Sequence, residues 1–169
     1  TKRGITRVQA PETAATGADG TGIKVCVIDS GINANHEEFA GISMTGYPSG
    51  WNNDSCGHGT HVAGTIAAAN NSAGVVGVSP AKVSLHIVKV FDGASCGWSY
   101  SSTLVDAANR CQSAGARIIS MSLGGSGSCD GTYQEAINGA ISRGTTVVEA
   151  AGNETDNASR YRPASCDGV

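Results

Sequence analysis

The sequence contains no cluster of basic residues. Its 169 residues include 11 Lys and Arg against 14 Asp and Glu, so the formal net charge is −3 at pH 7. Proteins that bind nucleic acids usually display a basic patch that contacts phosphates. We therefore expect no nucleic-acid partner.

Long apolar runs are absent as well. No run approaches the roughly 18 residues that a membrane-spanning helix needs. The N-terminal stretch TKRGITRVQAPETAATG also lacks the apolar centre of a signal peptide. We expect no membrane segment, and a secreted protein that begins in this way would be a mature form.

The six cysteines include no CxxC pair, which would have suggested a zinc site or thioredoxin-like chemistry. Their even number and wide spacing favour disulfides, and disulfides favour an oxidising compartment. Cys26, however, lies inside an apolar run, which predicts a buried free thiol. The six cysteines stand at positions 26, 56, 96, 111, 129 and 166.

The chain has the length of one domain, and no internal repeat or linker divides it. Runs of apolar and β-branched residues predict buried strands at 23–29, 83–90, 116–123 and 145–153. Helical patterns lie between them at 57–70, 101–115 and 132–144. This alternation predicts a parallel β-sheet flanked by helices, with ligand chemistry at the carboxyl ends of the strands. The last residues, YRPASCDGV, offer no element that closes the sheet edge, so we expect an α/β domain that is incomplete in this chain.

Three polar residues stand where such a sheet would place a site. Asp29 ends the run VCVID, Asn153 ends VVEAAGN, and His58 opens a predicted helix. A carboxylate beside an imidazole can activate a nucleophile, and an amide at a strand end can donate to an oxyanion. Each residue alone also fits a turn or an ordinary helix position. A zinc site is the alternative, because Asp29, His58 and His61 would provide the three protein ligands of a catalytic metal.

Four motifs, VIDSG, HGTHVAGT, SMSLGG and AAGN, resemble in this order those of the subtilisin-like serine proteases, of the secreted bacterial type. The resemblance runs from about residue 4 to the end. It implies a three-layer sandwich in which residues 1–169 are the N-terminal part of a single catalytic domain. Asp29 then matches the triad aspartate, His58 the triad histidine and Asn153 the oxyanion-hole asparagine, while His61 is a helix residue rather than a ligand.

The family's nucleophile is a serine in a GTSMAxP stretch beyond the oxyanion asparagine, and these 169 residues contain no such stretch. Ser30, Ser55 and Ser122 belong to motifs in which the serine has another place. We therefore expect a separate C-terminal fragment, produced by cleavage after Val169, to carry the catalytic serine. We expect no activity without it. The alternative is a non-catalytic fragment or a peptide-binding module.

The resemblance also implies a site for peptide or protein substrates. The segment Ser122, Leu123 and Gly124 matches the family's strand that pairs with extended substrate, and Gly97, Trp98 and Ser99 match the facing strand. Two such strands would clamp a peptide mainly through its backbone, which tolerates many sequences. Broad endopeptidase specificity is the expected result.

The loop NNSAGVVGVSP at 70–80 is similar to the family's calcium loop. The implied Ca²⁺ ligands are hard oxygen donors, as calcium requires. They are the side chains of Glu38 and Asn71 and the carbonyls of Ala69, Ala73 and Val75. Glu38 stands where the family commonly has Asp, and the family's N-terminal Gln ligand would precede Thr1.

Disulfide-bearing relatives imply a Cys56–Cys96 bond. A second bond, Cys129–Cys166, is suggested because both residues lie in loops after strands. Cys26 and Cys111 would then stay free. Four cysteines alone permit three pairings, so the sequence does not determine the connectivity.

Two further positions matter near the expected site. The family has a cis X-Pro bond at the position of Arg162-Pro163, and we expect one here. Glu149 departs from the small residues that the family has in this strand. A carboxylate buried there would need a partner or a raised pKa.

Overall fold

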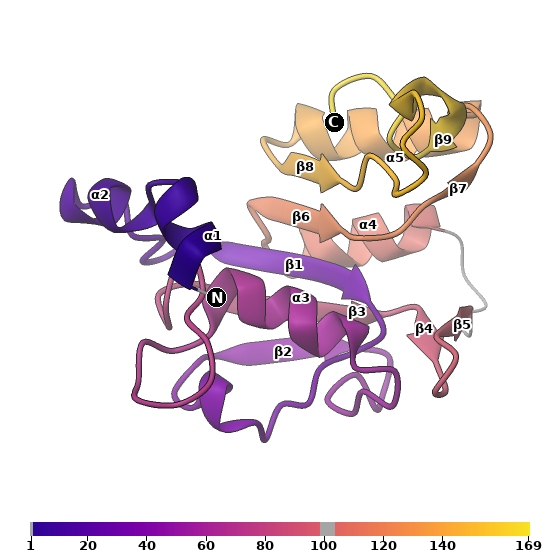
Figure 1. Cartoon of the computed structure of the whole chain (residues 1–169). Coiled ribbons are helices and arrows are strands. Elements are labelled where there is room, and N and C mark those ends of the chain that lie inside the picture. Colours follow the sequence, from indigo (N-terminus) through magenta and orange to yellow (C-terminus); the bar gives the residue numbers. More distant parts are fainter. Residues whose placement is uncertain (1, 99–103) are drawn as a thin grey trace.

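The computed structural model describes residues 2–98 and 104–169. Its centre is a sheet of five strands in the order β2-β3-β1-β6-β8, and all four strand pairings are parallel (Figure 1). Four of the strands confirm the predicted apolar runs. These are β1 (Lys24–Asp29), β3 (Ser84–Lys89), β6 (Ile118–Met121) and β8 (Thr146–Glu149).

The remaining strand of the sheet, β2 (Met44–Tyr47), was not predicted from the sequence. It pairs with β3 at the edge of the sheet, and none of its residues is fully buried. A strand of this kind does not need an apolar run, and its sequence, MTGY, contains none.

Three long helices cover the sheet. They are α3 (His58–Ala67), α4 (Leu104–Ser113) and α5 (Gly131–Ser142), and each lies within a stretch that was predicted to be helical or begins one residue before it. Side chains on a strand alternate between the two faces. Accordingly Val25 and Val27 pack with α3 residues in one core cluster, whereas Cys26 and Ile28 pack with α4 and α5 residues in the other. The molecule therefore has helix, sheet and helix layers, which confirms the predicted fold class.

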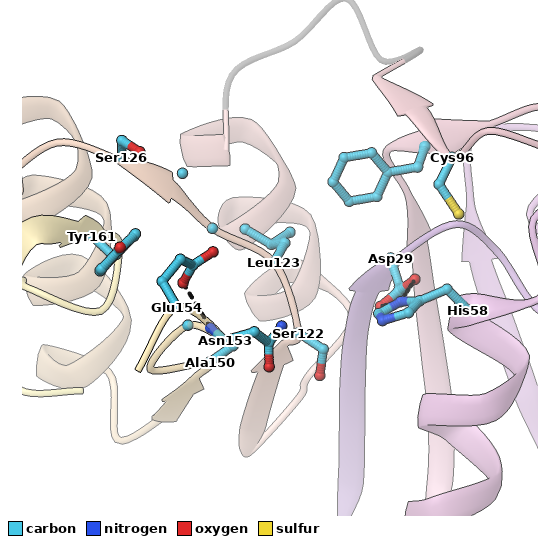
Figure 2. Close-up of a pocket in the computed structure, with 14 residues that line it drawn as sticks. Asp29, His58, Cys96, Ser122, Leu123, Ser126, Ala150, Asn153, Glu154 and Tyr161 are labelled. Atoms are coloured by element: carbon cyan, nitrogen blue, oxygen red, sulfur yellow. Dashed lines mark hydrogen bonds and ion pairs between the residues drawn. The ribbon is translucent and has the colours of Figure 1, made fainter. Parts of the chain in front are cut away.

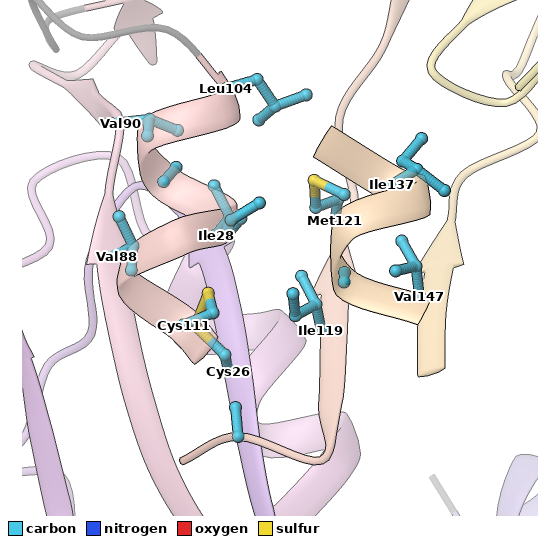
Figure 3. Close-up of a cluster of buried hydrophobic side chains, with 14 of the residues drawn as sticks. Cys26, Ile28, Val88, Val90, Leu104, Cys111, Ile119, Met121, Ile137 and Val147 are labelled. Carbon is cyan, nitrogen blue, oxygen red and sulfur yellow. A yellow bond between two sulfur atoms is a disulfide. The ribbon is translucent and has the colours of Figure 1, made fainter. Parts of the chain in front are cut away.

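The core on the α4 side holds a disulfide that was not predicted from the sequence (Figure 3). Cys26 on β1 bonds to Cys111 on α4, with the two Cα atoms 5.5 Å apart, and both residues are fully buried. The expectation of two free thiols is wrong. Side chains along β1 alternate between the two faces of the sheet, and Cys26 lies on the face that packs against α4. Cys111 lies on the face of α4 that packs against the sheet, next to Cys26.

The two disulfides that were predicted are both present. Cys56 bonds to Cys96 and Cys129 bonds to Cys166, with Cα separations of 5.2 and 5.0 Å. The first joins the segment before α3 to the hairpin of β4 (Phe91–Asp92) and β5 (Gly97–Trp98). The second joins the loop before α5 to the C-terminal segment.

The remaining elements are short. Two helices precede the sheet, α1 (Lys2–Arg7) and α2 (Ala10–Ala15). Two 3₁₀ turns are η1 (Glu37–Phe39) and η2 (Ala158–Arg160), and β7 (Gly125–Ser126) pairs with β9 (Tyr161–Arg162). In residues 2–98 and 104–169, no helix is long and apolar enough to cross a membrane.

Candidate active site

Asp29 lies at the carboxyl end of β1, between β3 and β6 in the sheet. Its side chain is fully buried, and one carboxylate oxygen accepts a 2.7 Å hydrogen bond from the backbone N–H of Ser30. Both carboxylate oxygens also lie close to Nδ1 of His58, at 2.8 and 2.9 Å. The structure thus places the predicted carboxylate and imidazole in direct contact.

His58 reaches Asp29 because α3 begins very close to the end of β1. Gly57, the N-cap of α3, has φ of 86°, a left-handed conformation that glycine adopts without strain. The next glycine, Gly59, lies so close to Gly31 and Asp29 that a Cβ there would be 3.2 Å from the Asp29 carboxylate and would overlap the carbonyl oxygen of Gly31. One glycine on each side of His58 therefore permits the start of α3 to approach the end of β1.

The pair forms one side of an open cleft of about 400 Å³ (Figure 2). Figure 2 shows Asp29 and His58 on one wall and Asn153, Glu154 and Tyr161 on the other, with Ser122 and Leu123 between them. The side chain of His58 is 50% exposed, and its Nδ1 is occupied by Asp29. No described residue forms a hydrogen bond to its Nε2, so this nitrogen can accept a proton from a group bound in the cleft.

The cleft collects most of the residues that were predicted as catalytic or substrate-binding. Asp29, His58, Asn153, Ser122, Leu123 and Gly124 all line it. Gly97 and Trp98 form β5, directly after Cys96, which is itself a lining residue. Ser99 lies outside the described residues.

Several lining residues were not identified from the sequence. Glu154 follows Asn153 directly, and its carboxylate accepts a 2.7 Å hydrogen bond from the backbone N–H of Asn153. Its position next to the AAGN motif was a signal that could have found it. Tyr161 reaches the cleft because β9 pairs with β7, where it lies opposite Ser126. Phe91 and Ser126 were not identified either, whereas the remaining lining residues, Cys96, Gly125, Ala150 and Gly152, belong to segments that the sequence had singled out.

The zinc alternative finds no support in the arrangement. Within the part of the chain that the structure describes, no three His, Cys, Asp or Glu residues are placed to hold a metal ion. His61 lines a different cavity, between α1, η1 and α3, together with His36 and Glu38. His58 and His61 thus serve different parts of the molecule although they are three positions apart.

The loop that resembles a calcium site surrounds a buried carboxylate. Glu38 is only 3% exposed, and its oxygens accept hydrogen bonds from Val75 N at 2.8 Å and from Asn71 Nδ2 at 3.4 Å. Asn71 Oδ1 in turn accepts from Ala73 N at 2.9 Å. No ion pair to Glu38 occurs among residues 2–98 and 104–169. The side-chain oxygens of Glu38 and Asn71 are hard donors of the kind that Ca²⁺ binds, and Glu38 is a buried carboxylate that no cationic side chain of the described residues neutralises, so the residues present fit this ion.

Glu149 is a half-buried residue near the cleft whose two carboxylate oxygens are buried. It lies at the end of β8 opposite Met121, and neither of its side-chain oxygens has a hydrogen-bond partner among the residues that the structure describes. Burial raises the pKa of Glu149 to about 8. The side chain is therefore largely protonated at neutral pH, and it does not line the cleft. The Arg162-Pro163 bond is cis, as predicted.

Comparison with known proteins agrees with this geometry. Residues 20–169 match the sequence profile of the Subtilase family. Subtilisin DY from Bacillus licheniformis is 40% identical, with the alignment covering 98% of this chain and 61% of that protein. Subtilisin Savinase from Lederbergia lenta is 46% identical over 89% of this chain and 55% of its own length.

A solved structure shares the fold. The psychrophilic subtilisin-like protease Apa1 from Pseudoalteromonas sp. AS-11 superposes with a TM-score of 0.82 at 40% identity, covering 95% of this chain and 38% of the Apa1 chain. The chain thus spans between 38% and 61% of the length of these relatives. The profile match, the identities and the shared fold lead to one conclusion: this chain belongs to the subtilase family.

Proposed function

We propose that residues 1–169 are the N-terminal part of the catalytic domain of a secreted serine endopeptidase. The observation that carries the proposal is the contact between the buried carboxylate of Asp29 and Nδ1 of His58 at the rim of an open cleft. The nucleophilic serine would come from a C-terminal segment outside these residues. That segment, whether a continuation of the chain or a separate fragment, is the partner we propose.

In this mechanism Asp29 holds His58 in the tautomer that carries its proton on Nδ1. Nε2 then accepts the proton of the serine hydroxyl while the serine oxygen bonds to the substrate carbonyl carbon. The same proton passes to the leaving amine when the peptide C–N bond breaks. Water repeats the sequence on the acyl-enzyme and releases the acid product.

The developing oxyanion needs hydrogen-bond donors at the opposite side of the attacked carbon. We propose that the side-chain amide of Asn153 is one of them, since Asn153 lies on the wall of the cleft facing His58 (Figure 2). Ser122, Leu123 and Gly124, together with Gly97, Trp98 and Ser99, would bind the extended backbone of a peptide.

Structural calcium is part of the proposal. Glu38 and Asn71 would supply side-chain oxygens, and Ala69, Ala73 and Val75 would supply carbonyls. A bound Ca²⁺ would neutralise the buried Glu38 carboxylate and cross-link η1 to the loop after α3. Secretion is proposed because all six cysteines are paired in three disulfides, which persist in oxidising compartments.

Replacement of the two histidines of α3 tests the function. In the complete enzyme, His58→Ala should lower kcat/KM on a peptide substrate by ~10³-fold or more, because it removes the general base. His61→Ala is the matched control, since it lies on the same helix outside the cleft, and it should leave kcat/KM within about twofold. Equal losses from both changes, or hydrolysis that needs added zinc, would refute the proposal. Peptide binding without hydrolysis would favour a peptide-binding module.

A further inference from the structure

Asp54 lies in the loop before α3, four residues ahead of His58. Each of its two carboxylate oxygens accepts two hydrogen bonds. Oδ1 accepts from Gly57 N and from Ser30 Oγ, each at 2.8 Å. Oδ2 accepts from Thr60 N at 2.8 Å and from Thr60 Oγ1 at 2.6 Å. One side chain thus binds Gly57 and Thr60, which lie on either side of His58 in the first turn of α3.

The local sequence explains why this carboxylate is needed. The first N–H groups of a helix have no partner within the helix, and an N-cap side chain usually accepts from them. Here the N-cap is Gly57, which has no side chain. Asp54 takes over that role from outside the helix, and its negative charge is favoured at the positive end of the helix dipole. Although burial alone would raise the pKa of Asp54, hydrogen bonds from Thr60, Gly57 and Ser30 hold it below its usual value.

Asp54 is also connected to the other half of the catalytic pair. The hydroxyl of Ser30 donates to Asp54 and accepts a 2.8 Å hydrogen bond from Gly59 N. The backbone N–H of the same Ser30 donates to Asp29 at 2.7 Å. Ser30 is fully buried, so water does not compete for these contacts. Hydrogen bonds therefore run from Asp54 to the segment that carries Asp29 and to the turn that carries His58.

We propose that Asp54 is a positioning residue, which holds His58 in register with Asp29 without contacting the substrate. It is not one of the residues that line the cleft. The inference rests on the proposed function, because the consequence of the positioning is faster proton transfer at His58. A residue that merely capped α3 would change stability, whereas a positioning residue changes kcat in protein that remains folded.

Asp54→Asn in the complete enzyme tests this proposal. The amide has nearly the same shape but only one acceptor oxygen, so its NH₂ group faces either the N–H of Thr60 or that of Gly57. We expect kcat to fall about 10- to 100-fold while KM stays within about twofold, since small misplacements of a catalytic group can cost up to ~10²-fold. Asp19→Asn is the matched control. Asp19 also accepts a backbone N–H, from Thr21, and pairs with Lys82. Asp19 precedes the amino end of β1, whereas the cleft lies at the carboxyl end of that strand and is lined by neither Asp19 nor Lys82, so the change should leave kcat unaltered.

Circular dichroism and thermal unfolding establish that the variants are folded. If Asp54→Asn does not fold, Ser30→Ala provides the second test, because it removes the bridge to Gly59 and leaves the cap on Thr60 in place. We expect about a 3- to 10-fold loss of kcat from Ser30→Ala. A folded Asp54 or Ser30 variant with kcat within twofold of wild type would overturn the proposal.

The failure of this inference and the failure of the proposed function give different results. A wild-type enzyme that does not hydrolyse peptides refutes the proposed function, and the positioning role is then judged by NMR. The proton on Nδ1 of His58 should exchange slowly in wild type, because Asp29 accepts it, and at least ~10-fold faster in the Asp54→Asn protein. Equal exchange rates would overturn the positioning role by itself.

Discussion

The carboxylate of Asp29, with no exposed surface, contacts Nδ1 of His58 through both of its oxygens, although 29 positions separate the two residues. One comes from the end of a central strand and the other from the first turn of a helix. The contact depends on glycines at 57 and 59, which let the helix start against the strand end. This geometry makes the following changes testable.

Asp29→Asn should lower kcat by about 10⁴-fold with little change in KM. An amide can present its NH₂ group to Nδ1 and so favour the wrong imidazole tautomer, and it cannot stabilise the imidazolium. Steady-state kinetics of the complete enzyme on a peptide substrate measure the effect. A loss of less than tenfold would show that the Asp29 charge is not part of the mechanism.

Glu149 should make the protein less stable as the pH rises from about 4.5 to about 8. The unfolded carboxyl releases its proton near the ordinary value of 4.5, whereas the folded one retains it to about 8. The unfolded state therefore binds fewer protons in this window, and stability falls by up to about 1.4 kcal/mol per pH unit. Glu149→Gln should remove this contribution.

The measurement for Glu149 is thermal unfolding across pH 5 to 9 for both proteins. Glu135→Gln, an exposed change on α5, is the control and should leave the wild-type slope. An unchanged slope in the Glu149 variant would mean that the carboxylate finds a partner that keeps it charged.

Removal of calcium should destabilise the protein if Glu38 is a ligand. When the free Ca²⁺ concentration is about 100 times the Kd of the site, binding stabilises the folded state by about 2.7 kcal/mol. Loss of this stabilisation corresponds to a Tm decrease of roughly 5–10 °C for a domain of this size. Glu38→Gln should have lost most of this response to chelator, while Glu37→Gln, its exposed neighbour in η1, should keep it. A wild-type Tm that is the same in Ca²⁺ and in chelator would contradict the calcium proposal.

Replacing Cys26 and Cys111 together with Ala should lower the free energy of unfolding by about 4–5 kcal/mol in the chain-entropy estimate for their long loop. The two residues are separated by 85 positions, against 37 for Cys129 and Cys166, so removal of the latter pair should cost somewhat less. Denaturant unfolding measures both. In the unreduced wild-type protein an alkylating reagent should modify none of the six cysteines of residues 1–169, and modification of Cys26 or Cys111 would contradict the observed pairing.

Much of the fold could be predicted from local patterns. Four of the five strands, including β8 at one edge of the sheet, are short apolar runs, and the helices between them have clear ends. β2 could not be predicted in the same way, because its sequence, MTGY, contains no apolar run, whereas β8 at the other edge does contain one. The Cys26–Cys111 bond was missed for a different reason. Burial of Cys26 was evident from its neighbours in β1, but its partner depends on how α4 packs against the sheet.

The candidate site shows the same division. Asp29, His58 and Asn153 stand in motifs with a recognisable order, so their roles could be proposed before their positions in space were known. Tyr161 has no such motif, and only the pairing of β9 with β7 brings it to the cleft. The role of Asp54 was likewise hidden, because it depends on hydrogen bonds that the loop makes after it folds against Ser30 and Thr60.

The most direct test of the central claim, that Asp29 and His58 serve a serine outside residues 1–169, is covalent labelling. The purified complete protein would be treated with a fluorophosphonate that reacts with activated serines, then denatured without reduction and analysed by intact mass spectrometry and peptide mapping. We predict one label per molecule, on a serine beyond Val169, and no label in the His58→Ala variant. Labelling of a serine within residues 1–169, or no labelling of a folded protein, would contradict the account.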